Sequence, residues 1–438
     1  MGFNQAYPVG ERIMAERTLT VWDVASLLVS TGCGIGFFLG TGELALQQGM
    51  AACLYAVATA IGLVALALYA PRLQKTGQSI WTSLGSLYGT TISQHVAAFS
   101  LIWMTGVLSA QIRGASAILA LSGMPQSTSI ISVDCLVLVF SFLRVSWLSS
   151  IFALCMCGCS AILIYTLTET HNLLLWLRAP VIFIESIRMQ PIEHTGLILL
   201  SVAALVLCGA DYQQFPAIAR TPAHARSGCM IAAVIVLGIG FLPASAVIAV
   251  ANVWQLNHLP DQVQIIPKLL AQAIGSSSQV ISTIVTCLLI VTALGSACSI
   301  LRAMIDAMAT VSRGSPVPPV FHRVLPVVAA TLIAIHGQSI INMIVTLNIV
   351  YLAAVVPLLA LTLLGYSIKD RSAKRSMFAG AGLSVLCILI EWTHVVHIPE
   401  ASPLIVAWPC AFIEALRSSG SVNQIEASHL SEQEFRQH

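Results

Sequence analysis

Long apolar runs separated by short polar segments dominate this chain. A membrane-spanning helix needs about 20 mostly apolar residues, and twelve runs reach or approach that length. They cover residues 19–46, 50–70, 92–121, 127–143, 145–167, 195–215, 229–253, 278–308, 324–335, 341–364, 377–396 and 403–416. The pattern predicts an all-α membrane protein with about twelve transmembrane helices, of which 324–335 is the shortest candidate.

Two further stretches between these runs are amphipathic. One is HNLLLWLRAPVIFIESIRM, residues 171–189, which follows the fifth run. The other is DQVQIIPKLLAQAI, residues 261–274, which follows the seventh run and contains a proline that would kink or open a helix. We expect both stretches to form loops that do not span the membrane.

Two of the apolar runs are interrupted at corresponding places. The first run contains STGCGIG at residues 30–36, and the sixth contains LCGADYQQF at residues 207–215. Each interrupted run would open one half of a five-plus-five arrangement of helices. Backbone can leave the helix at membrane depth only where it lines a cavity or is buried in protein, and paired breaks of this kind point to a transporter binding site.

The composition narrows the class of protein further. Of 438 residues, 57% are hydrophobic and 9% are charged, with a mean hydropathy of +0.88; a soluble domain carries about 25% charged residues. This excludes a soluble globular enzyme, a disordered chain and, with a net charge of only +2, a nucleic-acid binder. No nucleophile–base pair, zinc-protease motif, phosphate-binding loop or dinucleotide fingerprint is present, so we expect no enzyme and no cofactor.

The positions of lysine and arginine predict the orientation in the lipid bilayer. If the N-terminus is cytoplasmic, only three of the lysines and arginines fall in loops on the outer side of the membrane, and two lie within the spans. The inside segments would hold Arg12, Arg17, Arg72, Lys75, Arg144, Arg220, Arg226, Arg313, Arg323, Lys369, Arg371, Lys374, Arg375 and Arg417. We therefore expect a cytoplasmic segment 1–18, one transmembrane domain 19–416 (core spans 19–366, two further spans 377–416) and a polar cytoplasmic tail 417–438 in the cell membrane.

Small and hydroxyl-bearing residues at the first break and in the eighth run could form a cation site. Glycines at 32, 34 and 36 permit unwound backbone, whose carbonyl groups can replace the water shell of a small cation. Ala293, Ser296 and Ser299 are three residues apart and fall close to one face of a helix. The alternative for both groups is tight helix packing through small residues.

The few charged residues inside the spans are the other candidates. Arg302 and Asp306 are four residues apart on one expected helix, so they form either a plain ion pair or an inner gate. Arg113 has no partner in its own span, and Asp134 or Glu43 could neutralise it. Asp211, where the sixth run ends, could hold the broken helix or the inner loop in place.

Five segments of the chain resemble the sodium/solute symporter family. In chain order, they are GERIMAERTLTVWDVASLLVSTGCGIGFFLGTGELALQQG, APRLQKTGQSIWTSLGSLYG, ADYQQFPAIARTPAHARSG, LPDQVQIIPKLLAQAI and ALGSACSILRAMIDAMATVSR. They resemble, respectively, the first core span, the cytoplasmic loop after span two, the end of span six, an external loop and the span that supplies sodium-ligand hydroxyls. The resemblance covers about residues 10–392 and implies a divergent member that lacks the family's additional N-terminal span.

The resemblance implies a LeuT-type fold, with two inverted five-helix repeats, two extra C-terminal helices and alternating access. It implies secondary active transport of a small organic solute, with a sodium ion as the coupling ion. The implied sodium ligands are the backbone carbonyls of Ser30 and Cys33 together with Ala293, Ser296 and Ser299 of span eight. The implied substrate site lies at the two breaks and in span three, at Thr31, Gly32, Gly34, Gln111, Leu205 and Gly209.

One departure from the family pattern keeps the coupling open. The family has two adjacent hydroxyl residues in span eight, whereas Ser296 is followed here by Ala297. Ser299 could substitute only if the helix is rotated or distorted. The alternatives are therefore a proton-coupled or uncoupled transporter of the same fold and, less favoured, a transporter-like solute receptor. The sequence names neither the solute nor the oligomeric state.

Overall fold

The computed structural model describes residues 17–142, 145–256, 259, 261–273, 279–313, 317–335, 340–392, 401–417 and 420–421. Nearly all of the expected N-terminal segment and most of the expected polar tail lie outside the described residues, as do Arg12 and Arg144. The described chain is helical except for two short strands.

The first five apolar runs coincide with helices, and a short additional helix, α5, stands between the second and third runs. The elements are α2 (Val21–Gly32), α3 (Ile35–Gln48), the 3₁₀ turn η1 (Gly49–Cys53), α4 (Leu54–Thr76), α5 (Ile80–Tyr88), α6 (Thr90–Leu121), α7 (Gln126–Phe140) and α8 (Val145–Glu169).

The remaining seven runs coincide with or overlap helices too, and both amphipathic stretches form short helices between them. The elements are α9 (Leu173–Leu177), α10 (Ala179–Ile187), α11 (Ile192–Cys208), α12 (Ala210–Ala217), α13 (Pro222–Gly240), α14 (Leu242–Val250), η3 (Gln262–Gln264), α15 (Ile265–Ala273), α16 (Gln279–Val311), α17 (Phe321–Ala334), α18 (Ile340–Leu363), β1 (Tyr366–Ser367), α19 (Asp370–Trp392), α20 (Ser402–Leu416) and β2 (Gly420–Ser421).

Many of these helices are long and apolar enough to cross a bilayer. Within the described residues, six helical stretches meet that description, or up to seven if the bent pair α11–α12 is one span. Five shorter apolar helices, among them α2, α7, α17 and α20, accompany them. The fold is thus that of an all-α, multi-pass membrane protein.

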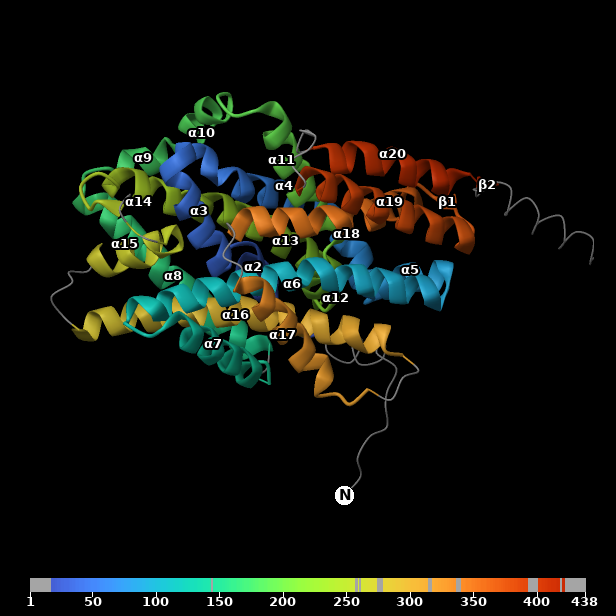
Figure 1. Ribbon diagram of the computed structural model, residues 1–438, viewed down its shortest axis with the longest axis horizontal. Coiled ribbons are helices and arrows are strands. Elements are labelled where there is room, and N and C mark those ends of the chain that lie inside the picture. The colour runs from blue at the N-terminus through green and yellow to red at the C-terminus, as the bar shows by residue number, and fades with distance from the viewer. Residues whose placement is uncertain are drawn as a thin grey trace, which may run out of the picture.

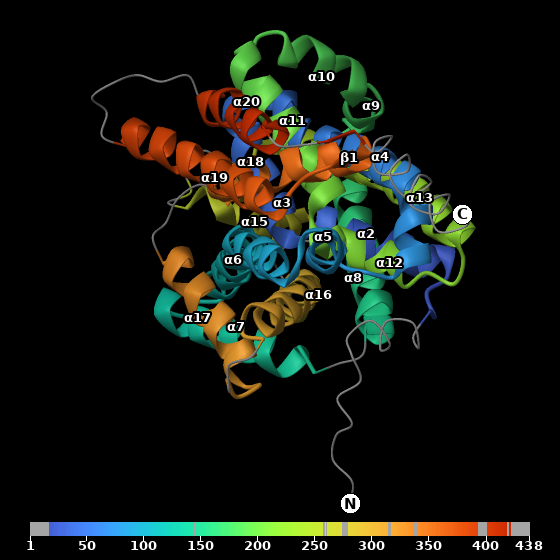
Figure 2. The ribbon, with the colours of Figure 1, turned by 90° about the vertical axis from the view of Figure 1, so that its right-hand side faces the viewer.

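Two groups of helices form the body of the molecule. In the first group, α11 and α13 pack against α4, and α2 packs against α13. In the second group, α7, α16 and α17 pack against α6. Figure 2, which looks along the long axis, shows α2, α4, α12 and α13 on one side and α6, α7, α16 and α17 on the other. Figure 1 shows α19 and α20 lying together at the edge of the molecule.

Local sequence signals explain where the key helices begin. Thr20 caps α2 in a capping box, since its side chain accepts from the Asp23 amide while the Asp23 carboxylate accepts from the Thr20 amide. Thr221 caps α13 in a similar way by accepting from the His224 amide, with Pro222 in the first turn. These caps fix the starts of two neighbouring helices in the first group.

The start of α2 and the end of α12 are tied together. Leu19 and Ala219 form an isolated parallel bridge, and the Arg220 amide donates to the Leu19 carbonyl at 3.0 Å. Gln74 of α4 adds a side-chain donor to the Ala219 carbonyl at 3.1 Å. The segments that carry the two breaks are therefore joined at one end of the first group, which favours their moving together.

Candidate functional site

The first break separates α2 from α3 at the position that the glycine pattern predicts. α2 ends at Gly32 and α3 begins at Ile35, so Cys33 and Gly34 lie outside both helices. The Cys33 amide still donates to the Val29 carbonyl at 2.7 Å. The break is buried, because Gly32, Cys33 and Gly34 all lie in the interior.

Gly34 brings three segments of the chain into close approach. A Cβ atom at this position would lie 2.5 Å from Ser296 Oγ on α16 and 2.9 Å from Gln111 Nε2 on α6. The Gln111 side chain reaches the break as well, because its Oε1 accepts from the Gly36 amide at 3.1 Å. A side chain at Gly34 would require Ser296 or Gln111 to shift, and the structure brings Gly34, Gln111 and Ser296 close together.

Helix α16, which approaches this break at Ser296, carries two buried hydroxyl groups without hydrogen-bond partners among the described residues. Ser296 and Ser299 are buried, and neither Oγ has a hydrogen-bond partner in the described part of the chain. Ala293 lies one turn earlier and is also buried. Buried hydroxyls are ordinarily paired, whereas the lone pairs of these two oxygens are free to accept a ligand.

Ser30 and Thr31 precede the break in the last turn of α2. Both are buried, and the Thr31 hydroxyl donates to the Leu27 carbonyl of its own helix at 3.1 Å. The hydroxyl of Thr31 thus already has an acceptor without a solute. A role for Ser30 as a carbonyl ligand and for Thr31 in solute binding stays a prediction.

The second break lies between α11 and α12, which meet at an angle of 41° at Gly209. The Gly209 amide donates to the Leu205 carbonyl in the last turn of α11. The Cys208 carbonyl, freed by the break, accepts from the Tyr351 hydroxyl of α18 at 2.8 Å. The backbone carbonyls of Leu205 and Cys208 at this break are therefore bonded from within the protein.

Asp211 stands in the first turn of α12, next to the second break. Its side chain is 1% exposed, and its Oδ1 accepts from the Tyr212 amide at 2.8 Å. No lysine, arginine or histidine forms an ion pair with Asp211 among the described residues, which makes it a buried acid without a cationic partner.

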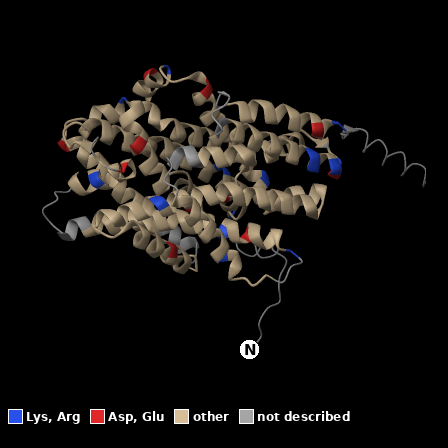
Figure 3. Cartoon of the chain, viewed as in Figure 1, with Lys and Arg blue, Asp and Glu red and all other residues tan. Residues whose placement is uncertain are grey.

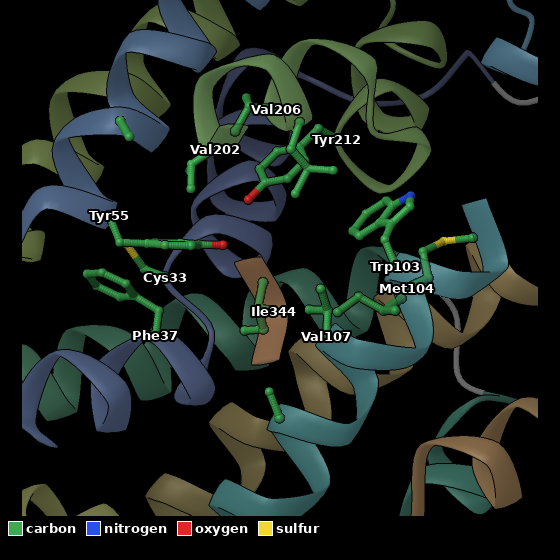
Figure 4. Close-up of a cluster of buried hydrophobic side chains, with 14 of the residues drawn as sticks. Cys33, Phe37, Tyr55, Trp103, Met104, Val107, Val202, Val206, Tyr212 and Ile344 are labelled. Atoms are coloured by element: carbon green, nitrogen blue, oxygen red, sulfur yellow. The ribbon is translucent and has the colours of Figure 1, made fainter. Parts of the chain in front are cut away.

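Two tyrosines that the sequence analysis did not single out lie beside the two breaks. Tyr55 of α4 and Tyr212 of α12 are more than nine-tenths buried, and neither hydroxyl has a hydrogen-bond partner within the described residues. Figure 4 shows the two hydroxyl groups pointing toward one another, with Cys33 beside Tyr55. A Cβ at Gly32 would lie 3.7 Å from the Tyr212 hydroxyl, so the tyrosines border the first break as well as the second.

Side chains from α6 and α18 complete the surroundings of these tyrosines. Figure 4 shows Trp103 and Val107 of α6 and Ile344 of α18 around the same centre. Trp103 packs on Tyr351 with ring centroids 5.8 Å apart, and its indole N–H has no partner in the described chain. Asn348 of α18 is fully buried with both amide atoms unpaired within the described residues. It is one of two asparagines in a long apolar run, and a polar amide in such a run is a signal that the sequence offered.

Three of the four charged candidates, Arg113, Arg302 and Asp306, lie on the second helix group. Arg302 is half-buried and interacts electrostatically with Asp306 on the next turn of α16. Arg113 is half-buried, and its Nε has no partner among the described residues. Asp134, considered as its counter-charge, instead accepts from the Thr331 hydroxyl at 2.8 Å. A gating role for these residues stays a prediction.

Comparison with known proteins identifies the fold without identifying a family. No protein-family profile matches the chain, and no curated protein sequence matches it. Among solved structures, a Na⁺-coupled sialic acid symporter in its substrate-bound outward-open state is similar at 12% identity, with a TM-score of 0.70 over 92% of this chain and 90% of that chain.

Two further transporters share the architecture. Mhp1, a nucleobase-cation-symport-1 family transporter in a closed conformation with bromovinylhydantoin bound, is similar at 11% identity, with a TM-score of 0.56 over 92% of this chain and 91% of that chain. MhsT in complex with L-phenylalanine gives 13% identity and a TM-score of 0.53 over 90% and 96%. These likenesses establish the LeuT-type fold that the sequence resemblance implied.

Proposed function

We propose that this protein is a secondary active transporter that couples the entry of a sodium ion to the entry of a small organic solute. The observation that carries the proposal is the meeting of Gly34, Gln111 and the unpaired Ser296 hydroxyl at the first break. The transporter domain would comprise residues 19–416, with both termini in the cytoplasm, as the distribution of lysine and arginine favours.

The ion site would be built from neutral oxygen atoms. Backbone carbonyls at Ser30, Cys33 and Ala293 would supply ligands from the unwound segment and from α16, and the hydroxyls of Ser296 and Ser299 would complete the set. Unwound carbonyls at membrane depth commonly coordinate a coupling cation in transporters. The unpaired state of both hydroxyls supports this use, since each has a lone pair to offer.

The solute would lie beside the ion, between the two breaks. Thr31, Gly32 and Gly34 would border it on one side, Leu205 and Gly209 on another, and Gln111 on a third. The unpartnered hydroxyls of Tyr55 and Tyr212 add two polar groups that could bind a solute hydroxyl, amide or carboxylate. Apolar neighbours such as Val107 and Ile344 would exclude water from the site.

The position proposed for the ion favours a coupling mechanism. One set of its ligands belongs to the first helix group, at the end of α2, and the other set belongs to α16 of the second group. A bound ion would therefore favour the arrangement in which these groups stand close together. Each ligand shifts the balance between outward-open and inward-open states only by its differential affinity for them, so sodium would promote solute binding in one of these states.

The test is uptake by the purified protein in proteoliposomes. Radiolabelled representatives of neutral sugars, amino acids, carboxylates and nucleobases would first be ranked by thermal shift, with and without sodium. The solute with the largest sodium-dependent shift is then offered under an imposed sodium gradient or an imposed proton gradient. We expect accumulation under the sodium gradient. Solute binding without any transmembrane flux would instead indicate a receptor.

A second candidate function is proton-coupled transport, and Asp211 is the observation that favours it. A carboxyl group buried without a cationic partner can bind and release a proton as its access to water changes. The absence of a hydroxyl at Ala297 also weakens the sodium site. Under this alternative the proton gradient would drive uptake, and Asp211→Asn would abolish that uptake because an amide cannot carry the proton.

A further inference from the structure

A basic pocket lies at the end of the molecule where α19 begins and α20 ends. It has a volume of about 640 Å³ and is lined by Lys369, Asp370, Arg371, Ser372, Arg375 and Arg417. Figure 3 shows lysine and arginine gathered at this end of the chain. The pocket is remote in sequence from both breaks, and the proposed transport function does not use it.

A short strand pair holds the two sides of the pocket together. β1 and β2 pair in an antiparallel manner, with Tyr366 opposite Ser421 and Ser367 opposite Gly420. Lys369 follows β1 by two residues, and Arg417 precedes β2 by three. This pairing brings cations from separate segments to one place, in addition to the direct packing of α19 on α20.

The charges in this pocket are not balanced within the protein. Asp370 is already paired with Lys374 at 3.3 Å, and Arg417 with Glu414 at 3.3 Å. The other three lining cations, Lys369, Arg371 and Arg375, have no ion pair in the described part of the chain. The start of α19 adds the positive end of a helix dipole, so the pocket presents an excess of positive charge to an anion.

Apolar surface continues from this pocket along the same two helices. Phe378, one turn beyond Arg375, is 53% exposed, and Leu386 farther along α19 is 51% exposed. On α20, Ile405 and Ile413 are exposed to a similar degree. An apolar groove of about 300 Å³ between α20 and α11 includes Ile405 and is lined by Leu200, Leu404, Ile405, Trp408, Pro409 and Phe412. A ligand suited to both surfaces has an anionic head and apolar tails.

We propose that this pocket binds the phosphate headgroup of an anionic phospholipid, whose acyl chains lie along the exposed faces of α19 and α20. Arginine pairs with phosphate through two parallel hydrogen bonds, which favours Arg371 and Arg375 as the main contacts. The pocket also lies among the segments that the positive-inside pattern assigns to the cytoplasm, where the leaflet carries anionic lipid. The lipid would fix the peripheral pair α19–α20 against the transporter core.

The test compares lipid binding by the full-length protein and two matched variants. Arg371→Ala/Arg375→Ala removes two pocket charges, whereas Arg226→Ala/Arg313→Ala removes two exposed arginines elsewhere on the surface. Native mass spectrometry in detergent measures retention of phosphatidylglycerol against phosphatidylcholine. Each basic residue near a lipid surface contributes about 1 kcal/mol, so the pocket variant should bind phosphatidylglycerol roughly 30-fold more weakly. The control variant should bind it as the unaltered protein does.

Three results would overturn the proposal. They are equal retention by the pocket variant and the unaltered protein, an equal loss in the control variant, and no preference for phosphatidylglycerol over phosphatidylcholine. A parallel thermal-shift series with inorganic phosphate separates the sources of the anion, because phosphate that stabilises the protein as well as phosphatidylglycerol would indicate a free-anion site. Arg375→Lys keeps the charge and the fold, and we expect it to retain most of the binding.

Discussion

The two helix breaks of this protein differ in how their polar groups are satisfied. At the second break, the Cys208 carbonyl accepts from Tyr351, and the Leu207 carbonyl accepts from the Gln213 side chain at 2.6 Å. At the first break, Gln111 secures the Gly36 amide, but the facing hydroxyl of Ser296 is unpaired. The freed backbone carbonyls of the second break are thus bonded within the protein, although Gln213 Oε1 beside them is unpaired, whereas at the first break it is the Ser296 hydroxyl facing Gly34 that lacks a partner among the described residues.

This difference assigns different tasks to the two breaks. At the second break, removing the partner of a bonded carbonyl should lower the free energy of unfolding, because that buried carbonyl is then left without a hydrogen bond. At the first break, removing an unpaired hydroxyl should affect ligand binding more than the free energy of unfolding, because no hydrogen bond between protein groups is lost. The variants below test this division of roles, in order of decreasing expected effect.

Gly34→Ala is expected to have the largest effect. The new Cβ would lie 2.5 Å from Ser296 Oγ, and overpacking of this kind costs about 1–3 kcal/mol and displaces neighbours. We expect uptake driven by sodium to be lost. Gly238→Ala is the matched control, because nothing lies within 4 Å of a Cβ there. Normal uptake by Gly34→Ala would contradict the close approach on which the ion site depends.

Tyr351→Phe tests the satisfied break. It removes the donor to the Cys208 carbonyl, and an unpaired buried carbonyl costs about 1–3 kcal/mol, so the thermal midpoint should fall. Tyr88→Phe is the control, since its partner Thr362 keeps a second bond to the Leu358 carbonyl and no group is stranded. Equal midpoints for the two variants would show that Tyr351 does not hold the second break.

Asp211→Asn sharpens the question of what drives transport. The amide oxygen can still accept from the Tyr212 amide, so this hydrogen bond is kept and the change should cost only about 1 kcal/mol. Under the sodium proposal, uptake driven by a sodium gradient persists in proteoliposomes. Loss of all gradient-driven uptake, with the thermal midpoint retained, would favour the proton-coupled alternative.

Tyr55→Phe should have the smallest effect on stability. Its hydroxyl has no partner in the described chain, so its removal should change the stability by less than about 0.5 kcal/mol. If the hydroxyl binds the solute, the KM for uptake rises while the thermal midpoint of the solute-free protein is unchanged. An unaltered KM would remove Tyr55 from the proposed solute site.

The fold could be predicted largely from the sequence because its signals are local. The apolar runs predicted the helices, and the glycines at positions 34 and 209 predicted the two breaks. The amphipathic stretch 261–274 contains the helix α15 and the turn η3. Each of these signals depends on residues that are neighbours in the chain, so periodicity and helix-breaking residues report them directly.

The site was predictable only in part because its contacts join distant segments. Gly34 and Ser296 are 262 positions apart in the chain, and their proximity followed from a family resemblance rather than from spacing. Tyr55, Tyr212 and Asn348 gave only the weak signal of polar groups inside apolar runs. The hydrogen bond from Tyr351 to the Cys208 carbonyl has no signal in the sequence, because a tyrosine in an apolar helix is ordinarily a packing residue.

The most direct test of the account is the binding of radioactive sodium to the purified protein, which needs no knowledge of the solute. We expect saturable binding that Ser296→Ala weakens roughly 10- to 100-fold, as the loss of one charge-assisted contact implies. Ser384→Ala, which alters a buried serine bonded to the Pro403 carbonyl of the α19–α20 pair, should bind sodium normally. Absence of saturable binding by the unaltered protein, or equal binding by Ser296→Ala, would contradict a sodium site at the first break.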